Sequence, residues 1–243
     1  MIDKGRWQGE IGYFDAAGAS TGRELFSLSL HADGSRTLRA QCEMDDDRLV
    51  RDVLLALEPD GRPGEAFVRI VEAGGSIGSG WYRFDDQGAD VEIRCAGAAV
   101  ETRREALPAG FGFFGSHALV NDGWLSRLAT RGTTTKLQQL ATSSLQANGG
   151  GVPAFHVTEA DIEHVGDVFI EVAAGGFECA HYRVGYGDYP ALDMWVTGPE
   201  LLLVRMSWEH LQGRYELLQL SGGDPSLTNS DTASAQTSGC SSI

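Results

Sequence analysis

The chain has 243 residues, of which 42% are hydrophobic and 22% are charged, which is the composition of a globular protein with a sizeable core. Its 34 acidic and 19 basic residues give a net charge of -15, and a field of that sign repels phosphate backbones and anionic lipid surfaces. We therefore expect no nucleic-acid partner. The sequence has no run of about 18 apolar residues and no secretory signal pattern, so we also expect a cytoplasmic protein without stable membrane insertion.

The first half of the chain alternates apolar and polar residues with a period of two, which places successive side chains on opposite faces of a sheet. Phe26, Leu28 and Leu30 share one face of a predicted strand, and Asp33-Gly34 is a strong hairpin signal after it. Further strands are predicted at 36–42, 49–57, 66–71, 80–84 and 91–95. Because turn residues recur about every ten residues, the pattern favours an antiparallel meander over strands joined by crossover helices.

The middle of the chain is predicted to contain one short helix, at 116–128. Ser116 is the expected N-cap, and Leu119 and Trp124 are apolar contact points. Another strand is predicted at 136–145, between two glycine-containing connections.

The second half returns to strand patterns. Strands are predicted at 152–165, 168–172, 178–186, 191–196, 201–208 and 214–220. The tail at 221–243 is rich in Ser, Thr, Gly and Asp and poor in large apolar groups, so it cannot bury enough surface to order itself. We therefore expect a single domain at 1–220, followed by a disordered polar tail.

A family resemblance is visible in the stretch 168–184, VFIEVAAGGFECAHYRV. It resembles the strand, A-G-x-F turn and strand of a bacterial family of unknown function with a β half-barrel like that of lipoprotein carriers. The segments 192–196 and 201–205 are similar to the strands that follow in that family. The resemblance covers roughly the last third of the folded chain. It implies a long, strongly curved antiparallel sheet around an apolar interior.

The predicted fold is therefore all-β, a curved antiparallel sheet that forms a barrel or half-barrel, lipocalin-like in outline, with one short helical insertion. About a dozen strands need closure or a cover for their edges. A barrel of this size can enclose one small ligand. The segment 116–128 is the natural lid or plug.

His117, Arg51 and Asp52 are the candidate catalytic residues. His117 lies in a glycine-flanked segment, from which an imidazole can reach a cavity, although a solvent-facing histidine is an equally simple interpretation. Arg51 and Asp52 interrupt an apolar strand on opposite faces, and an inward charge must be paired or functional because a lone buried charge is costly. Ser116, His117 and Asp122 have the composition of a catalytic triad, but the chain lacks a G-x-S-x-G elbow.

Polar and aromatic side chains on the predicted strands are candidate substrate-binding residues. His181 and Arg183 share one strand face, as do Asp193 and Trp195. If these faces are concave, the four side chains line the cavity, and if they are convex, the group is ordinary solvent-facing polarity. The large aromatic residues form either a stacking wall for a ligand or part of the core. These residues are Trp81, Tyr82, Trp124, Trp195 and Trp208.

No cofactor or metal is predicted. The glycine-rich segment 74–80 runs into a strand rather than a helix, so it is typical of a hairpin and not of a phosphate-binding loop. The histidines lack metal-ligand spacing.

Two functions fit this pattern. The first is a cofactor-independent enzyme, an isomerase, hydratase, lyase or cyclase, that acts on a hydrophobic small molecule by general acid/base chemistry inside the barrel. The alternative is a non-catalytic carrier or binding protein for a lipid-like ligand.

Overall fold

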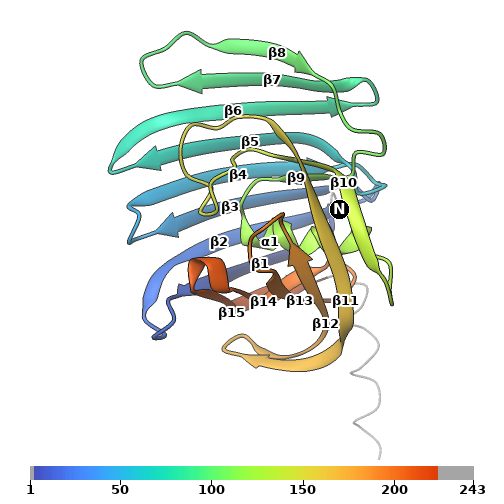
Figure 1. Cartoon of the computed structure of the whole chain (residues 1–243). Coiled ribbons are helices and arrows are strands. Elements are labelled where there is room, and N and C mark those ends of the chain that lie inside the picture. Colours follow the sequence, from blue (N-terminus) through green and yellow to red (C-terminus); the bar gives the residue numbers. More distant parts are fainter. Residues whose placement is uncertain (1–2, 224–243) are drawn as a thin grey trace, which may run out of the picture.

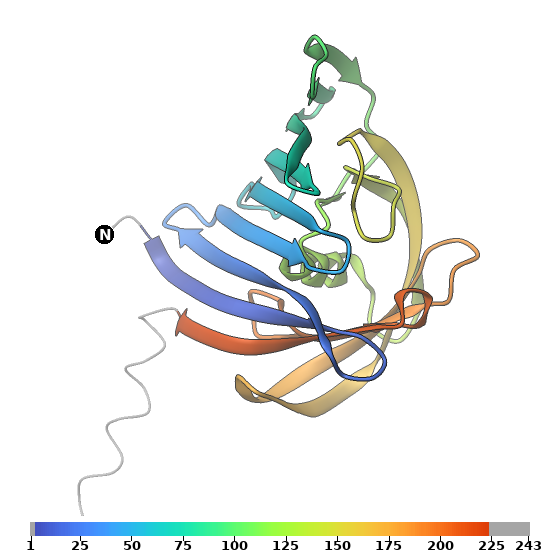
Figure 2. The same ribbon diagram turned by 90° about the vertical axis from the view of Figure 1, so that its left-hand side faces the viewer.

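The protein, seen here as a computed structural model that describes residues 3–223, is one curved sheet of 15 strands with a short helical segment on its concave side (Figures 1 and 2). The first eight strands are β1 (Asp3–Phe14), β2 (Ser20–His31), β3 (Arg36–Met44), β4 (Leu49–Leu57), β5 (Pro63–Glu72), β6 (Gly75–Asp85), β7 (Gly88–Cys95) and β8 (Glu101–Glu105). The remaining seven are β9 (Phe113–Gly115), β10 (Thr134–Thr142), β11 (His156–Val172), β12 (Gly175–Gly185), β13 (Leu192–Thr197), β14 (Leu202–Trp208) and β15 (Gly213–Gly223). The predicted all-β fold is confirmed.

The first and last strands lie side by side in the middle of the sheet. The strand order is β8-β7-β6-β5-β4-β3-β2-β1-β15-β14-β13-β12-β11-β10-β9. Strands β1 to β8 therefore form an N-terminal wing, and β9 to β15 form a C-terminal wing that ends beside β1. Every strand pair is antiparallel except β9 with β10. Because β8 and β9 are the two edges, the sheet curves without closing into a barrel.

Period-two burial places one face of each strand against the main core. In β4, predicted with the bounds that the structure has, Leu49, Val53, Leu55 and Leu57 are buried with Arg51 on the concave face, and the residues between them are partly exposed. The same alternation in β2, β3 and β5 buries one apolar row per strand. These rows and the helical segment form one continuous hydrophobic cluster.

The helical segment differs in detail from the prediction. It consists of α1 (Leu119–Asp122) and a 3-10 helix, η1 (Gly123–Leu128), and a second 3-10 turn, η2, lies at Glu209–Leu211. Ser116 is not the N-cap, because α1 begins after Ala118 and the Ser116 hydroxyl donates instead to Asn121 Oδ1 at 2.7 Å.

Other elements also differ from the prediction, and β1, β8 and β9 have no counterpart among the predicted strands. The strands predicted at 152–165 and 168–172 are one long strand, β11, whose register shifts between His164 and Gly166, so a bulge replaces the expected break. The predicted tail begins within β15, because Ser221, Gly222 and Gly223 still pair with β1. The rest of that tail, 224–243, lies outside the described residues. In the part of the chain that the structure describes, no helix has the length and apolar character needed to span a membrane.

Candidate functional site

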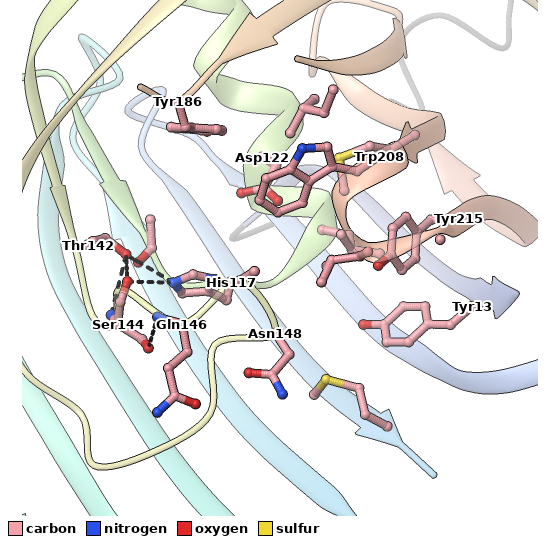
Figure 3. A pocket seen from close by; sticks show the side chains of 18 of the residues that line it. Tyr13, His117, Asp122, Thr142, Ser144, Gln146, Asn148, Tyr186, Trp208 and Tyr215 are labelled. Carbon is pink, nitrogen blue, oxygen red and sulfur yellow. Dashed lines mark hydrogen bonds between the residues drawn. The ribbon is translucent and has the colours of Figure 1, made fainter. Parts of the chain in front are cut away.

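A cavity of about 500 Å³ lies between the two wings of the sheet, the helical segment and the β10–β11 loop at 143–155 (Figure 3). Both wings supply side chains to it, together with α1. The residues that line it include Tyr13, Asp15, Met44, Asp46, Asp47, Arg51, His117, Leu119, Asp122, Leu140, Thr142, Ser144, Leu145, Ala147, Asn148, Tyr186, Tyr189, Leu192, Met206, Trp208, Leu211 and Tyr215. Most of these side chains are apolar or aromatic, as in most small-molecule pockets.

Glu24 fixes the start of the helix that borders the cavity. Its buried carboxylate accepts hydrogen bonds from the backbone N–H groups of Leu119 at 2.6 Å and Val120 at 3.0 Å. The Cys42 thiol and the Tyr13 hydroxyl also donate to it, at 3.4 and 3.3 Å. Burial raises the pKa of Glu24, and the two backbone N–H groups oppose that rise. A side chain of β2 thus caps a helix end that lacks a local capping side chain.

Arg51 joins β4 to the two segments that cover the cavity. Its buried guanidinium donates to the backbone carbonyl of His117 at 2.5 Å and to that of Asn148 in the β10–β11 loop. Gly149 has a φ of +67°, and a Cβ there would collide with this guanidinium. Of the predicted charge pair Arg51 and Asp52, Arg51 is therefore the member that points inward. It holds the backbone of the helical segment and of the β10–β11 loop in place.

His117 lies on the cavity wall in a left-handed backbone conformation, with a φ of 60°. Its Nε2 is 3.0 Å from both Thr142 Oγ1 and the carbonyl oxygen of Ser144. Because a carbonyl only accepts, this nitrogen carries the proton. Burial and the nearby Arg51 lower the pKa of His117 to about 4. The imidazole is therefore neutral at pH 7 and holds the β10–β11 loop against the helical segment.

Asp122, the last residue of α1, presents its carboxyl to the cavity and has no hydrogen-bond or ion-pair partner among residues 3–223. Burial and the charge of Glu24 raise the pKa of Asp122 to about 8, and Arg51 opposes the rise. Tyr186 and Tyr215 lie close enough to Asp122 for its charge to add to the effect of burial, which raises the pKa of both phenols, that of Tyr215 to about 12. Among the described residues, Asp122 is thus an unpartnered carboxyl at the inner wall of the cavity, with its pKa shifted toward neutral pH.

Aromatic rings form the wall beside Asp122 (Figure 3). The ring centroid of Trp208 is 6.3 Å from that of Tyr186 and 6.2 Å from that of Tyr189. Tyr215 meets Tyr13 edge to face at 5.2 Å. The indole N–H of Trp208 donates to the carbonyl of Pro190 at 2.7 Å, which fixes the ring in place and ties the 186–191 loop to β14.

The other predicted cavity residues of the N-terminal wing and the helical segment lie elsewhere. Asp52 is on the convex face of β4, 3.8 Å from Arg69, so it does not pair with Arg51 inside the cavity. Trp81 is also on the convex face, where its indole donates to Glu65 at 2.7 Å. Tyr82 and Trp124 are buried in the core, where their polar groups donate to backbone carbonyls at 2.7 and 3.0 Å.

His181, Arg183, Asp193 and Trp195 come together, but outside the cavity. Tyr182 and its neighbours of the same parity on β12 and β13 point into the core, so the four predicted residues occupy the opposite, convex face. His181 Nε2 is 2.6 Å from Asp193 Oδ1, its ring stacks on Trp195 at 4.5 Å, and Arg183 Nε is 3.7 Å from Asp193. The convex alternative of the sequence analysis is the one observed.

Sequence reasoning did not include Asp122, Tyr186 or Tyr215 among the site residues. Asp122 was visible only as part of a triad-like composition, and Trp208 only as one of several aromatic residues. Their convergence depends on the return of the chain through β12, β14 and β15 to the end of α1, which no local pattern records.

Comparison with known proteins identifies a fold and no family. No family model and no curated protein matches the sequence. Among solved structures, the chain is similar to a β-barrel-like protein of a domain of unknown function, DUF1849, from Brucella abortus, with 8% identity, a TM-score of 0.55, and coverage of 91% of this chain and 99% of that chain. A DUF1089 family protein from Pseudomonas aeruginosa matches with 14% identity, a TM-score of 0.42, and coverage of 77% and 90%. The expected resemblance to bacterial barrel proteins of unknown function is confirmed for the fold.

Proposed function

We propose that this chain is a binding or carrier protein for a hydrophobic small molecule, which occupies the cavity between the two wings of the sheet. The observation that carries the proposal is the cavity itself. Its volume of about 500 Å³ falls within the range of roughly 300 to 1,000 Å³ that is common for small-molecule sites. Met44, Leu119, Leu140, Leu192 and Met206 line it, and each methylene that a ligand buries there contributes about 0.8 kcal/mol to binding.

The mouth of the cavity supports the same function. Leu145, Tyr189 and Leu211 line the cavity and are also exposed to solvent. Exposed apolar side chains grouped at an opening are typical of sites that receive apolar ligands. The resemblance of 168–184 to half-barrels of the lipoprotein-carrier type favours a lipid-like compound as the ligand.

The residues first considered catalytic support binding more than chemistry. Both terminal nitrogens of Arg51 and the Nε2 of His117 are engaged by groups of the cavity wall, and Asp52 lies on the other face of the sheet. These contacts give the Arg51 guanidinium and the His117 Nε2 a role in holding the wall together.

Asp122 favours the cofactor-independent enzyme as a second candidate. An unpartnered carboxyl whose pKa is raised to about 8 by burial is close to the value at which general acid/base catalysis is efficient near neutral pH. The isomerase, hydratase, lyase or cyclase function of the sequence analysis therefore rests on Asp122 rather than on His117 or Asp52.

A neutral fluorescent dye tests the binding function. N-phenyl-1-naphthylamine becomes bright in an apolar site, so we expect saturable fluorescence with the wild-type protein. Ala147→Trp places an indole into the cavity from the β10–β11 loop and should weaken dye binding at least tenfold. Ala98→Trp, the same change in an exposed turn after β7, is the control and should bind normally. Circular dichroism verifies that both variants fold. Equal dye binding by Ala147→Trp and the wild type would contradict the proposal.

Deuterium exchange separates a carrier from an enzyme. The compound that the purified protein retains is identified by native mass spectrometry and then incubated with fresh protein in deuterium oxide. A carrier returns it with an unchanged carbon-bound isotope content. An enzyme that removes and returns a proton at carbon adds deuterium, and this gain should disappear in Asp122→Asn while it persists in Asp161→Asn, an amide substitution at an exposed carboxylate on β11.

A further inference from the structure

We propose that the ligand of this cavity carries a cationic group, a quaternary or protonated amine, which the Asp122 carboxylate and the aromatic wall around it bind together. The inference rests on the proposed binding function, because it assigns the head group of the molecule that fills the same cavity. Three independent features support it: a carboxyl without a partner, a group of aromatic rings beside it and an acidic mouth.

The carboxyl of Asp122 lacks a partner in the part of the chain that the structure describes. Asp122 is partly exposed to the cavity, and a carboxylate that is largely removed from water is ordinarily paired or hydrogen-bonded, because burying a lone charge is costly. Arg51 is the single lysine or arginine among the described lining residues. Its terminal nitrogens are engaged by the carbonyls of His117 and Asn148, and its charge acts on Glu24 as well as on Asp122. No lysine or arginine of the described lining is therefore free to pair with an ionised Asp122, and a cationic group of the ligand can take that position.

The rings beside Asp122 are suited to such an ion. Tyr186 and Tyr215 are close enough to feel the charge of Asp122, and Trp208 is 6.3 Å from Tyr186. The faces of aromatic rings attract cations at about 6 Å or less, and several rings around one point form the usual binding site for quaternary ammonium groups. A carboxylate combined with these rings selects a positive group that also has apolar substituents.

The mouth of the cavity adds attraction at long range. Asp15, Asp46 and Asp47 line it and are exposed, and the whole chain carries a charge of -15. Clefts lined by one sign of charge concentrate ligands of the opposite sign. The apolar side chains at the same mouth, described above, can accept the hydrocarbon part of an amphiphilic amine.

The inference predicts a pH dependence with a definite sign. The groups that act on Asp122 are Glu24 from β2 and Arg51 from β4, and it acts in turn on Tyr186 after β12 and Tyr215 from β15; His117 lines the same cavity and is neutral above pH 5. Burial raises the pKa of Asp122 to about 8, so a cation must displace its proton below that pH. Affinity for a permanent cation should therefore fall about tenfold for each pH unit below 8.

The test compares ligands that differ only in the head group. Octyltrimethylammonium, 1-octanol and octyl sulfate are titrated calorimetrically into the full chain between pH 6 and pH 9. We expect the cation to bind at least tenfold tighter than octanol at pH 9, with the sulfate weakest. Asp122→Asn should remove at least tenfold of the cation affinity and its pH dependence, and leave octanol within twofold. Asp161→Asn removes the same charge from the convex surface and is the matched control.

Ring variants test the aromatic contribution. Tyr186→Phe keeps the ring and should retain the affinity for the cation within twofold. Tyr186→Leu removes the ring and should weaken cation binding about fivefold, with no comparable change in the affinity for octanol. Equal affinities for cation and octanol, or equal losses in Asp122→Asn and Asp161→Asn, would overturn the inference. If octanol and the naphthylamine dye still bind in that case, the proposed binding function stands. If neither binds, both proposals fail.

Discussion

Replacing Asp122 by asparagine should stabilise the protein, and the gain should grow with pH. The amide has the shape of the protonated carboxyl but cannot ionise. Burial raises the pKa of Asp122 from its ordinary value of 3.8 to about 8 in the folded chain, so between these values the native state binds more protons than the unfolded state. In the wild type, the stability that the Asp122 carboxyl contributes is therefore present at acidic pH and is lost as the pH rises toward 8.

The size of the effect follows from the same two values. Each pH unit between 3.8 and about 8 corresponds to about 1.36 kcal/mol, which gives an upper limit of about 6 kcal/mol above pH 8. Asp122 borders a cavity that water can enter, which reduces the cost of ionisation. We therefore expect the stability of Asp122→Asn relative to the wild type to increase by about 2 kcal/mol between pH 5 and pH 9.

Urea unfolding followed by tryptophan fluorescence measures this difference directly. The free energy of unfolding is determined for the wild type and Asp122→Asn at pH 5 and pH 9, and the variant should gain about 2 kcal/mol relative to the wild type over that interval. Any general effect of the amide cancels in this comparison. An equal difference at both pH values would show that the carboxyl titrates normally, which would refute the argument that its environment disfavours charge.

Three further substitutions test the contacts around the cavity, each by urea unfolding at pH 7. Glu24→Gln places an amide N–H₂ against one of the two backbone N–H groups that now donate to the carboxylate. We therefore expect the free energy of unfolding to fall by about 2 kcal/mol. A fall below about 0.5 kcal/mol would contradict the capping role of Glu24. Tyr82→Phe leaves the carbonyl of Ala154 without its donor and should cost about 1 kcal/mol; an unchanged midpoint would contradict that bond. Asp52→Asn breaks only a long exposed ion pair with Arg69, so the free energy of unfolding should stay within about 0.5 kcal/mol of the wild type and dye binding should be unchanged. Weaker dye binding would contradict the position of Asp52 outside the cavity.

Strands β2 to β7 of the N-terminal wing could be predicted because their turns and their alternation are local, whereas β1 and β8 were not predicted. The faces of those strands were harder to assign. In β4, Val50, Leu54 and Ala56 of one face are apolar, as are Leu49, Val53, Leu55 and Leu57 of the other face. Both parities therefore looked buried, and the sequence could not decide whether Arg51 or Asp52 pointed inward. The concave face of β4 is set by its neighbours β3 and β5, whose alternation is clearer.

The convex cluster of the C-terminal wing shows the same limit in another form. Alternation correctly separated His181 and Arg183 from Tyr182, and the registers of β12 and β13 place His181 opposite Trp195. Which set faces the core depends on the side of the sheet that the helical segment occupies. In the structure the row of Tyr182, Val184, Leu192 and Met194 takes that side, which buries apolar area. The polar row lies on the convex face with its own ion pairs and with Trp195.

The position of Asp122 is determined by the N-terminal wing, although its surroundings come from the C-terminal wing. The carbonyl of His117 is held by Arg51 of β4, and the N–H groups of Leu119 and Val120 are held by Glu24 of β2. A non-glycine residue at positive φ, such as His117, persists only where its surroundings dictate the backbone. These contacts fix the start of α1, and one turn later its last residue must face β14 and β15. Glu24 and Arg51 can therefore influence binding without contacting a ligand, because they set where the Asp122 carboxyl meets the aromatic wall.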